Sequence, residues 1–254
     1  MKVILQALSL SDRYERKARL LPGIIAASPA ALTAAALSAG YFTWYEAFGS
    51  GVGAEAVLAF VLGYLARARG KVAEVSLLAK SGGFPTTRWL RPTNESRSDP
   101  QKSKWRGAIK RLTGLTIPAI VTPERTEADI DKVIKDATEQ LRYQLRERPE
   151  AAMLKIHNED YGQARNLHGL RWHWVMIAVL SFALCVVLLI LGQRPWLALG
   201  LSGLSLVIAL LVSRESEELV RRCADRYGES FFAAMMMYDD AKTKAEGKSE
   251  EGHH

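Results

Sequence analysis

Charge is absent from two long stretches of this chain, and cysteine is scarce along the whole of it. Residues 174–191 hold no charged side chain, and residues 195–212 hold none either. The chain has two cysteines among its 254 residues. Cys185 lies in the first uncharged stretch and Cys223 in a charged segment, so the sequence predicts neither a disulfide framework nor a cysteine-bound metal cluster. A free thiol at Cys223 favours a reducing, cytosol-facing location.

The motifs of the common enzyme classes are also missing. Gly82 and Gly83 are not followed by the Gly-Lys-Ser/Thr of a phosphate-binding loop, and no Gly-x-Ser-x-Gly nucleophile elbow occurs. His157, His168 and His173 have no spacing typical of a metal site. The uncharged stretches lack the central charge of a carrier with a buried ion or proton site. We therefore expect a protein that is not an enzyme and that binds no cofactor or metal ion.

The two uncharged stretches are each about as long as a helix that spans a bilayer. A hydrocarbon core of about 30 Å requires roughly 20 helical residues. Turn residues separate the stretches at 192–195, which read Gly-Gln-Arg-Pro. We therefore predict a transmembrane helical hairpin over residues 172–213. A buried hairpin of a soluble protein is the alternative, but two adjacent runs of this length are rare in soluble cores.

A second, more weakly apolar hairpin is predicted over residues 22–66. Residues 22–45 carry no charge, and they end in aromatic residues of the kind that form an interfacial belt. Pro29 is expected to kink this span or to mark its true start. A glycine-rich outer turn is predicted at 46–55. The returning run, 56–66, reaches the length of a span only if it includes Glu55 or if Arg67 and Arg69 extend their side chains to the interface.

The distribution of basic residues predicts the orientation of the hairpins. Of the 34 lysines and arginines, only Arg194 lies in a predicted outer turn, and the rest lie in 1–21, 67–171 and 214–254. By the positive-inside rule these three segments are cytoplasmic. The expected fold is therefore all-α, a polytopic membrane protein with two transmembrane hairpins. Its cytoplasmic parts are an amphipathic leader (1–21), a helical insert (67–171), a C-terminal helix (214–242) and a disordered tail (243–254).

The insert begins with a strongly basic segment. Residues 67–111 contain twelve lysines or arginines and three acidic residues. This segment could lie on anionic lipid headgroups, or bind a phosphate-bearing ligand with Trp89 and Trp105 stacking on bases. An ordinary positively charged loop is the simplest interpretation. Farther on, Thr126 and Asp129 have the spacing of a capping box, which predicts a helix that ends before Pro149.

Other residues indicate assembly. After Ser213 the fourth span is predicted to continue as a helix with an apolar stripe formed by Leu219, Val220, Cys223, Tyr227, Phe231, Ala234 and Met235. Small residues repeat at intervals of four within the spans, which favours close helix packing and a homo-oligomer. Glu46 and Glu55 would then form an acidic ring at the mouth of a pore, although simple marking of the outer side is the plainer alternative.

Two short motifs carry a resemblance to a known family. They are GGFPTTRWLR at 82–91 and YGQARNLHGL at 161–170. In these motifs, and in its hairpins, the chain resembles a family of uncharacterised bacterial four-helix inner-membrane proteins with Gly-Gly-x-Pro-Thr-Thr-x-x-Leu-Arg and Tyr-Gly-x-x-Arg-Asn-x-x-Gly-Leu motifs. The resemblance covers about residues 20–213 and implies a multi-pass fold in the inner membrane with both termini cytoplasmic. Small membrane proteins of this layout also act as effectors of bacterial defence systems, which is an analogy of architecture.

The motifs suggest a candidate ligand site or, equally, fixtures of the fold. If the motifs meet, a cationic pocket at the cytoplasmic membrane face would be lined by Thr86, Thr87, Arg88, Arg91, Arg165 and Asn166. We expect a gated oligomeric effector or channel that responds to a cytosolic signal. The alternative is a non-catalytic scaffold that recruits a cytosolic protein through the insert and the C-terminal helix. The expected partners are the lipid bilayer, further copies of the chain, an anionic ligand or lipid headgroup, and a cytosolic protein.

Overall fold

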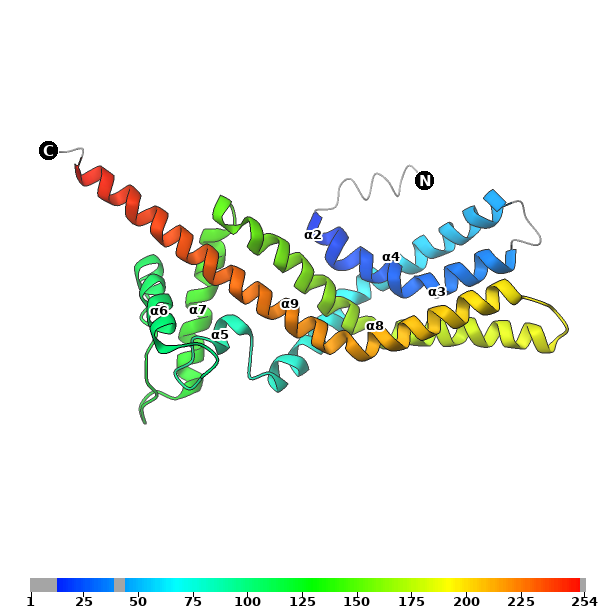
Figure 1. The fold of residues 1–254 in the computed structure, drawn as a ribbon, viewed down its shortest axis with the longest axis horizontal. Helices are drawn as coiled ribbons and strands as arrows, with labels where there is room; N and C mark the ends of the chain where they lie inside the picture. Colours follow the sequence, from blue (N-terminus) through cyan, green and yellow to red (C-terminus); the bar gives the residue numbers. More distant parts are fainter. Residues whose placement is uncertain (1–12, 39–43, 252–254) are drawn as a thin grey trace. The chain divides into compact units, whose positions relative to one another are not determined.

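The computed structural model describes residues 13–38 and 44–251, and every regular element in these ranges is a helix. The all-α prediction is therefore confirmed. The helices are α2 (Arg13–Glu15), η1 (Arg16–Leu20), α3 (Leu21–Ser38), α4 (Trp44–Lys80), α5 (Pro85–Arg88), α6 (Asp99–Thr113), α7 (Glu127–Leu145), η2 (Pro149–Ala151), α8 (Ala152–Ile190) and α9 (Trp196–Glu251) (Figure 1).

The chain forms two compact units. The first unit comprises residues 1–77 and 159–222, and the second comprises 78–158 and 223–254. The predicted insert, 67–171, therefore divides between the units, because its first and last parts continue the helices of the predicted spans. Helix α9 has residues in both units as one unbroken helix, as predicted for the segment after Ser213.

Three helical segments within the described residues are long and apolar enough to cross a membrane. They are Arg13–Ser38, Pro149–Ile190 and Trp196–Glu246. They include three of the four predicted spans, and the span at 56–66 stays a prediction. The predicted outer turn at 46–55 is wrong, because α4 begins at Trp44 and continues without a break to Lys80. Glycine weakens a helix by only about 1 kcal/mol, and no proline interrupts these residues.

Many large side chains of the apolar helices are exposed, while several small ones are buried. On α8, Ala178 and Cys185 are fully buried, whereas Leu180 is 62 % exposed. On α9, Ala209 is fully buried and Leu211 is 60 % exposed. Water would drive the large apolar groups inside, whereas lipid tails solvate them and leave small residues to mediate close helix packing.

Pro29 does not interrupt α3. Proline has no N–H, so the carbonyl of Ile25 loses its ordinary partner four residues later. The hydroxyl of Ser28 donates to that carbonyl at 2.9 Å. Hydroxyl groups of neighbouring serines commonly satisfy carbonyls that proline frees in membrane helices, and here the helix continues to Ser38.

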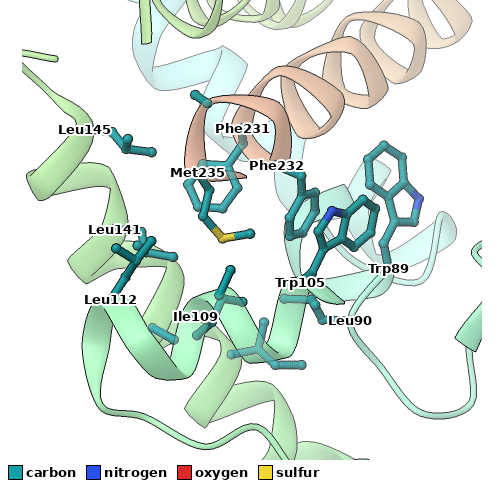
Figure 2. Packing of buried hydrophobic residues seen from close by; sticks show 14 of the residues in the cluster. Trp89, Leu90, Trp105, Ile109, Leu112, Leu141, Leu145, Phe231, Phe232 and Met235 are labelled. Carbon is teal, nitrogen blue, oxygen red and sulfur yellow. The ribbon is translucent and has the colours of Figure 1, made fainter. Parts of the chain in front are cut away.

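The second unit has an aromatic core between α5, α6, α7 and α9 (Figure 2). Trp105 stacks on Phe232 with ring centroids 3.9 Å apart, and Trp89 lies against the same ring at 6.2 Å. Both tryptophans are buried, so the alternative in which they stack on the bases of a nucleic acid is wrong. Phe231 and Met235 are fully buried in the same core, as the predicted stripe on α9 requires; Leu219 is the member of that stripe that is exposed.

Two helix ends compare differently with their predictions. The capping box is confirmed, because Thr126 accepts from the N–H of Asp129 and the Asp129 side chain accepts from the N–H of Thr126. The disordered tail predicted from residue 243 is wrong as far as residue 251, where α9 ends. Alanine, lysine and glutamate are strong helix formers, and Lys242 faces Glu246 one turn later. Residues 252–254, and residues 1–12 of the predicted leader, lie outside the described residues.

Candidate functional site

The first motif, residues 82–91, belongs to the second unit and begins with a tight turn after α4. Gly82 and Gly83 have φ angles of 73° and 107°, which only glycine adopts at low cost. The N–H of Gly83 donates to the carbonyl of Leu78 at 2.7 Å, which closes the end of α4. Pro85 then starts α5 at its first position, where a missing N–H costs nothing.

The two arginines of this motif are bound by carboxylates from distant helices. Arg91 makes a two-pronged contact with Asp131 of α7, with Nε to Oδ1 at 2.8 Å and Nη2 to Oδ2 at 2.6 Å. The remaining guanidinium nitrogen of Arg91, Nη1, donates to the carbonyl of Gly82 at 2.6 Å. The hydrogen bond with Asp131 raises the pKa of Arg91. Arg88 donates to Asp225 of α9 at 2.9 Å and to the carbonyl of Ser81 at 2.9 Å.

The two threonines of the motif are not available to a ligand on the surface. Thr86 is 1 % exposed and Thr87 is 5 % exposed. The Thr86 hydroxyl has no hydrogen-bond partner within the described part of the chain. α5, which carries these threonines, lies against the aromatic core, where Phe84 meets Tyr227 edge to face at 5.5 Å. The motif therefore holds α4, α5, α7 and α9 together within the second unit.

The second motif, residues 161–170, belongs to the first unit and lies on α8. Asn166 is 1 % exposed, and its Nδ2 donates to the carbonyl of Ala18 at 2.5 Å. On another side it touches α4 at Gly70, where a Cβ atom would come within 2.3 Å of Asn166 Oδ1. A Cβ atom on Gly169 would lie 2.4 Å from the nitrogen of Gly70, so these two helices approach along their backbones.

A carboxylate of α4 organises the other polar residues of this motif. Arg165 donates from Nη1 to Glu74 Oε2 at 3.2 Å, and the hydroxyl of Tyr161 donates to the other oxygen of Glu74. Arg165 also donates to Asn166 Oδ1 at 3.3 Å. The Arg165 side chain is 12 % exposed. As in the first motif, the arginine is held by a carboxylate of its own unit.

A histidine in the same motif completes a hydrogen-bond chain between α8 and α9. Ser216 Oγ donates to the carbonyl of Ser213 at 2.7 Å, so the proton between it and His168 Nδ1, at 2.8 Å, belongs to the histidine. Arg171 Nη1 donates to His168 Nε2 at 2.7 Å. His168 is therefore the neutral tautomer with hydrogen on Nδ1. Its role is to join two helices just below their uncharged stretches.

The predicted site residues thus fall into two groups, one in each unit. Thr86, Thr87, Arg88 and Arg91 come together in the second unit, and Arg165 and Asn166 in the first. A pocket that joins the two groups stays a prediction. Glu55 is half-buried on α4, and the side chain of Glu46 lies outside the described part. Among the described residues, no group of three His, Cys, Asp or Glu side chains could hold a metal ion.

Sequence reasoning missed the acidic partners of the two motifs. Glu74 binds Arg165, Asp131 binds Arg91, and Asp225 binds Arg88. Glu74 carried a usable signal, because it is one of only three acidic residues among twelve basic ones in 67–111. Asp131 and Asp225 stand in helices of mixed charge, where nothing in the sequence separates them from their neighbours.

No protein family, curated protein or solved structure matches this chain.

Proposed function

We propose that this chain is a multi-pass protein of a bacterial inner membrane that acts as a gated effector, with the second unit receiving a cytosolic signal. In this proposal both termini are cytoplasmic and several copies assemble around a pore, with Glu46 and Glu55 at its outer mouth. The charge asymmetry of the sequence supports the orientation. The outward-facing leucines and buried small residues of α8 and α9 support the membrane location.

Helix α9 is the observation that carries the effector role. Its first part is one of the uncharged stretches, and its later part supplies Phe231, Phe232 and Met235 to the core of the second unit. Because no turn interrupts it, a change in how the second unit holds α9 would act on the uncharged stretch of the same helix. Ion pairs also hold it, among them Arg88 with Asp225 and Arg111 with Asp239, and the latter carboxylate is 5 % exposed.

Ion flux from vesicles tests this role. The full chain would be reconstituted into phosphatidylethanolamine–phosphatidylglycerol vesicles filled with KCl, and potassium efflux would be recorded. D225A removes the partner of Arg88 and should raise efflux above that of the unmodified protein. D240A removes an exposed carboxylate from the same helix, and its efflux should match that of the unmodified protein.

The same experiment decides between the effector and the scaffold. A scaffold that recruits a cytosolic protein through the second unit has no pore. If equal amounts of all three proteins enter the vesicles and none of them raises efflux above that of protein-free vesicles, the effector proposal fails. The scaffold would then be the better account.

A further inference from the structure

An apolar stripe runs along the outer face of α4. Val57 is 69 % exposed, Tyr64 is 81 % exposed, Val72 is 70 % exposed and Val75 is 71 % exposed. With Val61 and Ala68, these residues recur every three or four positions, so they lie on one side of the helix. The opposite side is buried and includes Ala59, Leu62, Ala66, Gly70 and Leu77. From Val57 to Val75 the stripe is about 27 Å long.

The half of the stripe from Ala68 to Val75, here called the lower half, lies C-terminal to the apolar run of α4. The chain is apolar from 56 to 66, and charged residues follow. Val75 adjoins Glu74, which is paired with Arg165, nine residues before the start of the uncharged stretch of α8 at Trp174. Exposed valines at this level need a partner, because contiguous apolar surface outside a hydrocarbon core marks an interaction site.

Unpaired basic residues flank the lower half. Arg67, Arg69 and Lys71 are all exposed, and none of them has an ion-pair partner among the described residues. On the helix, Arg67 and Lys71 fall on one side of the stripe and Arg69 on the other. An anionic phospholipid layer offers both kinds of contact that this surface requires, apolar chains for the valines and phosphates for the basic groups. A second copy of the chain would instead bring like charges together.

We propose that α4 from Val57 to Val75 is a lipid-contact face, and that Arg67, Arg69 and Lys71 bind the headgroups of anionic phospholipids. This inference rests on the membrane location proposed above, but it does not require a pore. The basic side chains extend along the helix to the phosphates. The apolar stripe lies against the acyl chains and, in its lower half, against the part of the headgroup layer next to them.

Spin labels can test the contact of the stripe with lipid. Both native cysteines are buried, so an introduced surface cysteine can be labelled selectively. V72C would be compared with L219C in the full chain, in nanodiscs of phosphatidylcholine and phosphatidylglycerol. Residue 72 lies six positions past Ala66, and Leu219 lies six positions past Ser213 and is 43 % exposed. The label at 72 should meet oxygen more often than a water-soluble nickel chelate, and the label at 219 should show the reverse.

Two results of the labelling would overturn the proposal. One is equal access of the nickel chelate to positions 72 and 219, which would place the stripe in water. The other is a label at 72 that is shielded from both reagents and broadened by a second label nearby, which would show that another copy covers the stripe.

Charge removal tests the headgroup contact. In the triple variant R67Q/R69Q/K71Q, the ratio of phosphatidylglycerol to phosphatidylcholine in the co-purified lipid should fall, by on the order of fivefold for each residue replaced. K104Q/K110Q/K135Q removes three exposed lysines from α6 and α7 and should keep the preference. Equal lipid preference in both triple variants would contradict the proposal. Because lipid preference is measured on co-purified lipid, it can fail or succeed independently of potassium efflux.

Discussion

The side-chain amide of Asn166 donates a hydrogen bond to the main-chain carbonyl of Ala18, at 2.5 Å. The carbonyl lacks its ordinary helical partner because the residue four positions later is Pro22, which has no N–H. The same proline disturbs the turn before it, and Arg16–Leu20 form a π-helix in which the N–H of Leu21 donates to the carbonyl of Arg16. Asn166 thus satisfies a buried acceptor that a proline creates on another helix.

Replacing this asparagine should destabilise the first unit. N166L removes the donor and leaves the Ala18 carbonyl without it, at an expected cost of about 1–3 kcal/mol. The thermal midpoint of the nanodisc-embedded protein, followed by circular dichroism, would report the loss. Q163L is the matched control, because Gln163 is a half-exposed residue on the same helix. Equal midpoints for N166L and the unmodified protein would show that the hydrogen bond does not stabilise the unit.

A methyl group at Gly70 should separate α4 from α8. In G70A the new Cβ would lie 2.3 Å from Asn166 Oδ1 and 3.1 Å from Asn166 Cα, so a helix has to move. Overpacking of this kind typically costs about 1–3 kcal/mol. G200A is the control, since no atom lies within 4 Å of the Cβ position there. Alanine is the better helix former, so G200A should raise the thermal midpoint slightly while G70A lowers it.

The contact of Arg91 with Asp131 should stabilise the second unit. A double-mutant cycle of R91M and D131L, measured by chemical denaturation, should give a coupling of about 1–2 kcal/mol, because both side chains are mostly buried and the contact is two-pronged. Arg97 with Glu229 is the comparison pair; that glutamate is 61 % exposed, and we expect a coupling under about 1 kcal/mol. A ligand site without a structural role would instead leave stability unchanged in R91M.

The start of α7 should loosen in acid. The Thr126 hydroxyl and then Lys132 lower the pKa of Asp129 by hydrogen bonds to its carboxylate. The stabilising contribution of Asp129 is therefore complete above its ordinary pKa and is lost as the pH falls through the lowered value. Amide protection factors of Glu127–Ile130 should fall over this range in the unmodified protein and in D136N, an exposed control on the same helix. D129N should show no such step, and a step of full size in D129N would contradict the assignment.

Local sequence patterns predicted much of the helical fold. The uncharged stretches, the break at 192–195 and the cap at Thr126 each depend on residues that are close in the chain. The structure confirms a helix over each uncharged stretch and after Thr126, and it confirms the break between α8 and α9. The continuation of α9 past Ser213 follows from the same periodicity. Patterns of this kind are readable because helix hydrogen bonds and helix faces repeat every three to four residues.

Weaker local signals led to the two errors in helix boundaries. Glycines at 49, 51 and 53 predicted a turn, and the polar composition after Lys242 predicted disorder. The structure has helix in both places. In each case the cost of a few poor or solvated positions is small beside the hydrogen bonds gained by continuing a helix that has already formed.

By itself, the sequence determined that the chain is helical, where its apolar stretches lie and which segments carry the positive charge, because these properties belong to single segments. Only the tertiary structure decided that Arg88 meets Asp225, that Arg165 meets Glu74 and that each motif joins helices within a different unit. Each of these contacts joins residues on different helices. Its geometry exists only after those helices have packed, and many acidic residues along the chain could have served as the partner before that.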